Sequence, residues 1–101
     1  MFAAFVDIFT MKLSVASEKT YLPIGSVLSV KQAIHVNVGS VDHPMLPEHF
    51  IEWVYVQTEN GGQRKVLKPG DEPHVTFFLG DDKAVAVYAY CNLHGLWKTE
   101  I

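Results

Sequence analysis

A thiol and an imidazole stand three residues apart near the C-terminus, at Cys91 and His94 in the run CNLHGLW. A free cysteine usually behaves as a small buried hydrophobe, but a histidine three positions on also allows the two residues to chelate a metal. Two ligands are too few to hold an ion. The segment DHPMLPEH supplies two more imidazoles, His43 and His49. One cysteine and three histidines therefore form the candidate metal-binding set.

Each pair of these residues also has an ordinary structural explanation. Cys91 and His94 are equally compatible with a buried thiol and a histidine at a turn. Histidines are common in loops, so His43 and His49 are weak candidates by themselves. The other two histidines are expected to have surface or structural roles, because His35 falls on the wet side of a predicted strand and His74 opens another after a proline.

Length and composition predict one domain over residues 1–101, since 101 residues can bury one core but not two. Hydrophobic residues make up 49% and charged residues 19%, as in folded soluble proteins. The formal charge is −3 and no basic patch is interleaved with aromatic residues, which argues against nucleic-acid binding. A single cysteine excludes an internal disulfide framework and favours a metal site or a reduced compartment, which we take to be the cytoplasm.

The N-terminal residues 1–17 are interpreted as an extension or packing segment. Their first ten residues are apolar, but they include Asp7 and lack a basic start and a cleavage site, so neither a signal peptide nor a membrane span is expected. A packing helix, a dimer contact and a start at Met11 are all compatible with this run. We favour packing or a dimer contact, and therefore expect a homo-oligomer without membrane attachment.

Short segments with alternating polarity predict an all-β fold. In the first clear strand, Ile34, Val36 and Val38 share one face. Further strands are predicted at 50–58, 63–68, 74–79, 83–90 and 97–101, and proline or glycine predicts loops at 21–26, 41–49 and 68–73. Strands this short, without any long helical period, indicate a sandwich or barrel. In a sandwich, the loop before the 50–58 strand and the loop after the 83–90 strand can meet at one end.

Four blocks in chain order carry a family resemblance: GSVDHPM (39–45), EHFIEW (48–53), LKPGD (67–71) and CNLHGLWK (91–98). Together they closely resemble the iron domain of desulfoferrodoxin and neelaredoxin, the superoxide reductases, from about Glu18 to the C-terminus. The resemblance implies an immunoglobulin-like β-sandwich of about seven antiparallel strands. It also implies a mononuclear non-haem iron centre with four equatorial histidines and one axial cysteine thiolate.

Carried over residue by residue, His43, His49 and His94 match three of the equatorial histidines, and Cys91 matches the thiolate. Imidazoles suit a borderline metal such as ferrous iron, and a thiolate opposite an open position pushes electron density toward a bound ligand. The same set of donors also suits tetrahedral zinc. Zinc is therefore retained as the alternative metal.

A second family motif, Glu-Lys-His-x-Pro, corresponds to the stretch EKTYLP. The resemblance implies that Lys19 assists the substrate anion and that Glu18 is able to cap ferric iron, which makes both candidate catalytic residues. Thr20 stands where the family has its remaining equatorial histidine, and an extra residue precedes Pro23. Water is the expected occupant of that equatorial position.

The resulting functional hypothesis is one-electron reduction of superoxide to hydrogen peroxide. Desulfoferrodoxin carries a rubredoxin-like domain with four cysteines, but this sequence has one cysteine, so a separate rubredoxin-like donor is expected to supply electrons. The alternative is a family member that binds zinc or iron without reductase activity. A third hypothesis is an interaction module in which the four candidate ligands are vestigial.

Overall fold

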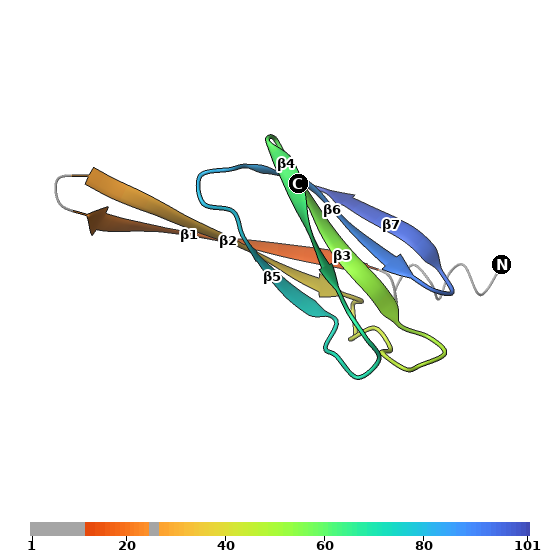
Figure 1. The fold of residues 1–101 in the computed structure, drawn as a ribbon. Coiled ribbons are helices and arrows are strands. Elements are labelled where there is room, and N and C mark those ends of the chain that lie inside the picture. The colour runs from red at the N-terminus through yellow and green to blue at the C-terminus, as the bar shows by residue number, and fades with distance from the viewer. Residues whose placement is uncertain (1–11, 25–26) are drawn as a thin grey trace.

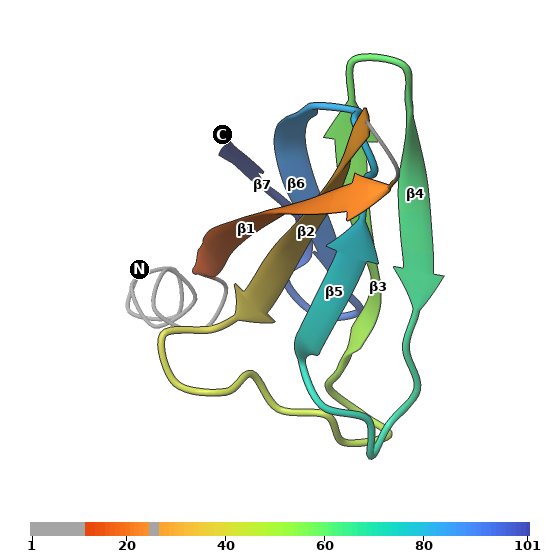
Figure 2. The same ribbon diagram turned by 90° about the vertical axis from the view of Figure 1, so that its left-hand side faces the viewer.

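Seven antiparallel strands form two packed sheets in the computed structural model, which describes residues 12–24 and 27–101. The three-stranded sheet has the order β1 (Leu13–Ile24), β2 (Val27–Val38), β5 (His74–Phe78). The four-stranded sheet has the order β4 (Gly61–Val66), β3 (Ile51–Thr58), β6 (Ala84–Cys91), β7 (Gly95–Glu100). Figures 1 and 2 show the sheets facing each other, and the predicted all-β, immunoglobulin-like sandwich is confirmed. The described residues contain no helix that is long and apolar enough to span a membrane.

The core lies between the sheets and follows from the alternation of side chains along each strand. On β2, Ile34, Val36 and Val38 point inward and are almost completely buried, as their spacing predicts. Both sheets contribute apolar side chains to the same layer, which joins them into one core. The largest fully buried side chains are Val36, Val38, Ile51, Val54, Val56, Phe77, Val87 and Cys91.

The hairpin of β1 and β2 is longer than the sequence predicts. A loop was expected over residues 21–26, but β1 continues to Ile24, with Pro23 opposite Leu28. That prediction is therefore wrong for residues 21–24, while residues 25–26 lie outside the described part. Pro23 is compatible with the pairing because β1 is an edge strand, where a missing N–H donor is tolerated.

The half of this hairpin nearest its turn extends away from the sandwich. β2 pairs with β5 only from Ala33 to Asn37, so the outer half of the hairpin is paired only within itself (Figure 1). Some of the residues interpreted as an N-terminal extension belong to the sandwich, because residues 13–17 lie in β1. Residues 1–11, including the apolar run considered as a dimer contact, lie outside the described part.

Strand register places the loops of the candidate ligands at one end of the sandwich. Ile51 at the start of β3 pairs with Cys91 at the end of β6. The connection 39–50 leaves β2 in one sheet and enters β3 in the other at this same end. It carries His43 and His49, while the short turn between β6 and β7 carries His94.

The core predicts a sharp contrast between two neighbouring phenylalanines on β5. Phe77 is 0% exposed and Phe78 is 60% exposed. In the metal-free protein, Phe77→Ala should lower the free energy of unfolding by about 3–5 kcal/mol, because it leaves a cavity in the core. Phe78→Ala should lower it by less than about 1 kcal/mol, since only surface contacts are lost. Urea unfolding followed by circular dichroism measures both, and equal losses would contradict the assigned orientation of β5.

Candidate metal centre

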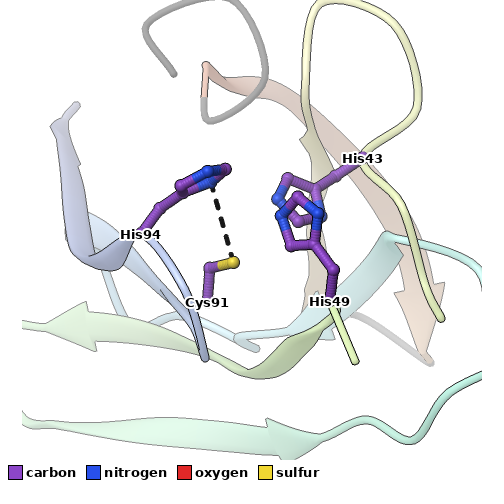
Figure 3. A group of neighbouring side chains, drawn as sticks. All are labelled: His43, His49, Cys91 and His94. Carbon is purple, nitrogen blue, oxygen red and sulfur yellow. Dashed lines mark hydrogen bonds between the residues drawn. The ribbon is translucent and has the colours of Figure 1, made fainter. Parts of the chain in front are cut away.

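Four side chains from two separate segments converge at the end of the sandwich (Figure 3). One ligand atom from each of His43, His49, Cys91 and His94 lies within 4.8 Å of all the others. Two metal–ligand bonds of about 2.0–2.3 Å on opposite sides of an ion span about 4–4.6 Å. The separations of up to 4.8 Å are thus close to the span across one shared ion, and the grouping expected from the sequence is present.

The three imidazole rings are nearly perpendicular to one another. The interplanar angles are 82° for His43 and His49, 85° for His43 and His94, and 89° for His49 and His94. Their ring centroids are 4.8, 5.9 and 4.8 Å apart in the same order. Rings in this arrangement surround a common point without stacking, and Figure 3 shows His94 facing the two loop histidines across it.

His43 provides the clearest test of whether the group fits a metal. It is only 2% exposed, and its Nδ1 lies 2.7 Å from the carbonyl oxygen of Pro44. A carbonyl can only accept, so Nδ1 carries the hydrogen and Nε2 presents a lone pair. This Nε2 is buried without a hydrogen-bond partner, which costs free energy unless another group satisfies it. A metal ion is such a group, and a carbonyl that orients a ligand histidine is typical of metal sites.

The protonation state of His43 also favours coordination. Burial is the main cause that lowers its pKa below the ordinary value of 6.5, and the nearby His49 and His94 lower the pKa further. The hydrogen bond to Pro44 opposes this shift by raising the pKa. The ring is thus held in its neutral form, which is the form that binds metals.

The turn after β6 directs the second pair of ligands toward each other. Cys91 is fully buried at the end of the strand, and its Sγ lies 3.8 Å from Nδ1 of His94. Gly95 has a φ of 79°, a left-handed conformation that favours glycine and permits this tight reversal. Trp97 then donates its Nε1–H to the carbonyl oxygen of His94 at 3.0 Å, which ties the turn to β7.

The structure does not bring Glu18 or Lys19 into this group. Both lie on β1, where Glu18 pairs with Ala33 and Lys19 with Gln32. Leu13 pairs with Val38, where the connection that carries His43 begins, and Glu18 lies five residues further along β1, about 16 Å at the usual rise per residue. Its Oε1 lies 3.3 Å from Nε2 of His35.

The other two histidines lie on the outer surface of the three-stranded sheet. Nδ1 of His35 lies 2.9 Å from Oγ1 of Thr76. The ring of His74 lies between Asn37 at 2.7 Å and Asp42 at 3.1 Å. Neither histidine joins the candidate ligands, in agreement with the surface roles expected for them.

Comparison with known proteins places the chain in a family. The desulfoferrodoxin family model matches residues 12–100. The chain belongs to the desulfoferrodoxin family. The resemblance recognised in the sequence is confirmed at this level, and the blocks that carried it lie within the matched residues.

Several relatives in this family share substantial identity with the chain. A desulfoferrodoxin homolog of Archaeoglobus fulgidus is 50% identical over 65% of this chain and 52% of its own length. A superoxide reductase of Pyrococcus horikoshii is 39% identical over 67% of this chain and 71% of its own length. The crystal structure of the superoxide reductase from Treponema pallidum matches with a TM-score of 0.64 and 41% identity, covering 81% of this chain and 64% of that one. The chain thus spans about half the length of desulfoferrodoxins that it matches, with 52% and 51% for two of them.

Substitution of a candidate ligand should separate metal binding from folding. With cobalt(II) as a spectroscopic probe, the protein should bind one ion and show a thiolate-to-metal charge-transfer band. Cys91→Ser should abolish that band, and His43→Ala should weaken binding by about tenfold or more, because each removes a donor atom. His35→Ala is the matched control and should leave both the band and the affinity unchanged. A charge-transfer band that persists in Cys91→Ser would exclude the thiol from the coordination sphere.

Proposed function

We propose that the chain is a superoxide reductase with a mononuclear non-haem iron held by His43, His49, Cys91 and His94. The observation that carries this proposal is the convergence of three imidazoles and one thiol within 4.8 Å, in a member of the desulfoferrodoxin family. The names of the relatives from Pyrococcus horikoshii and Treponema pallidum support the same activity. Zinc and iron both accept such donors, and the family favours iron.

The reaction converts one superoxide, one electron and two protons into one hydrogen peroxide. Iron held by the four side chains would supply the electron. The Cys91 thiolate would donate electron density to the metal, while the buried His43 is held neutral and oriented by the carbonyl of Pro44. His49 and His94 are partly exposed, so a diatomic anion and protons from water can reach this end of the sandwich.

Electrons for repeated turnover must come from a redox centre other than the proposed iron site. The single cysteine belongs to the candidate metal centre, so the sequence does not offer the four thiolates of a rubredoxin-like centre. We therefore propose a rubredoxin-like donor, a cytoplasmic location and superoxide as substrate. The expected homo-oligomer and the roles of Glu18 and Lys19 stay predictions.

A zinc-binding member without reductase activity is the second candidate function. One observation favours it: three histidines and one cysteine complete a tetrahedral set, as structural zinc requires. Thr20, which stands where the family has its remaining equatorial histidine, lies on β1 opposite Lys31. Zinc has no accessible redox change, so a zinc protein of this kind would leave superoxide untouched.

Metal analysis combined with a superoxide assay distinguishes the two functions. Protein purified without added metal should contain about one iron per chain and little zinc. With an electron donor present, it should form one hydrogen peroxide per superoxide consumed and release no dioxygen, because no second superoxide is oxidised. Stoichiometric zinc, or an iron-loaded protein that does not accelerate superoxide loss, would overturn the reductase proposal.

The position of Thr20 predicts the result of restoring the family histidine. Thr20 is seven residues along β1 from Leu13, or about 23 Å at the usual strand rise. Thr20→His should therefore change neither iron content nor superoxide consumption, because the new imidazole cannot reach the four ligands. Iron content per chain and the rate of superoxide loss measure this. A joint increase in both would show that the hairpin brings this position to the metal.

A further inference from the structure

We propose that Asn92 is a positioning residue that fixes the distance between the His49 loop and the Cys91–His94 turn. This inference rests on the metal-binding role proposed above for those side chains. The candidate ligands come from segments more than forty residues apart in sequence, at 43–49 and 91–94. Some interaction must hold the two segments in register if four donor atoms are to meet at one ion.

The side-chain amide of Asn92 supplies such an interaction on both sides of His49. Its Nδ2 donates to the carbonyl oxygen of Glu48 at 3.0 Å, and its Oδ1 accepts the backbone N–H of Phe50 at 3.0 Å. The backbone N–H of Asn92 also donates to the carbonyl oxygen of Phe50 at 3.3 Å. One amide thus binds the two residues that flank His49, much as a neighbouring strand would.

The chemistry of this contact is specific to asparagine. The amide provides one donor and one acceptor at the correct separation for the carbonyl and N–H groups it meets. A carboxylate at the same position has no donor, so it would place negative charge against the Glu48 carbonyl. The Oδ1 atom also lies 3.9 Å from Sγ of Cys91, so that charge would oppose the thiolate. Asn92→Asp therefore tests the contact with almost no change in shape.

Other contacts hold different parts of the His49 loop. The carbonyl oxygen of Met45 accepts the N–H of Gly70 at 2.9 Å, and Leu46 and His49 exchange two backbone hydrogen bonds at 2.9 and 3.0 Å. These contacts shape the loop internally or attach it to the 68–73 connection. Asn92 is instead adjacent to Cys91 in the chain, so it joins the loop directly to the segment that bears the other two ligands.

The chain offers a matched control at the opposite end of the four-stranded sheet. Asn60 lies in the turn between β3 and β4, is exposed like Asn92, and donates its Nδ2 to Oδ1 of Asp82 at 3.1 Å. Asn60→Ala and Asn92→Ala each remove a surface amide that links two segments. Only the second removal is adjacent to the candidate ligands.

The experiment measures cobalt(II) affinity by competition with a chelator, the charge-transfer spectrum, and urea unfolding of the metal-free protein. Asn92→Ala should weaken cobalt binding by about 10–100-fold and shift the charge-transfer band, as expected for loss of a group that orients ligands. Asn92→Asp should weaken binding at least as much. Asn60→Ala should keep the cobalt affinity of the unsubstituted protein to within about twofold. It should change the free energy of unfolding of the metal-free protein by about as much as Asn92→Ala does.

Two results would overturn this role for Asn92. One is cobalt affinity and a spectrum in Asn92→Ala and Asn92→Asp that match the unsubstituted protein. The other is an equal loss of affinity in Asn60→Ala, because the effect would then be a general loss of stability. Cobalt binding needs neither iron nor superoxide, so failure of this role leaves the proposed function standing. Failure of the unsubstituted protein to bind cobalt would instead remove the metal site and both proposals together.

Discussion

The pairing of β3 with β6 is the constraint on which the rest of the site depends. Ile51 and Cys91 are paired and fully buried, so the end of one strand and the beginning of the other are fixed side by side. A shift of β6 by one residue would turn Cys91 away from the interior, because side chains alternate between the two faces. The core therefore aligns the thiol with the loop that carries His43 and His49.

Burial of His43 links the stability of the sandwich to the occupancy of the site. A buried nitrogen without a hydrogen-bond partner costs about 1–3 kcal/mol, and Nε2 of His43 is such an atom. A bound ion satisfies that lone pair and joins loops that otherwise meet through hydrogen bonds. Metal binding and folding should therefore be coupled, as in other proteins whose ligands come from distant segments.

The outer half of the long hairpin lies apart from the candidate centre. The core side chains of both sheets support the end where the ligands lie, whereas the outer half of β1 and β2 pairs only within itself. Glu18 and Lys19 lie on this hairpin, and Glu18 contacts His35 across the sheet surface. The chemistry proposed for the chain is therefore concentrated in the two segments that carry the candidate ligands, 43–49 and 91–94.

The sequence by itself determined the features that depend on local patterns. Alternation at Ile34, Val36 and Val38 identifies a half-buried strand, and the block CNLHGLWK identifies the family together with Cys91 and His94. Features that depend on distant contacts appeared only in the tertiary structure. Pro23 predicts a loop from its own chemistry, yet pairing along the edge of the sheet keeps it in a strand.

The same limit applies within the candidate site. The set of four candidate ligands was predicted from residue types and resemblance, whereas the contacts that support them were not. The partners of Asn92 are 44 and 42 residues away, at Glu48 and Phe50, and no local pattern specifies such a pairing. The burial of His43 likewise results from the way a loop folds over the end of the sandwich. Local spacing determines which atoms could bind a metal, and only long-range packing decides how they are held.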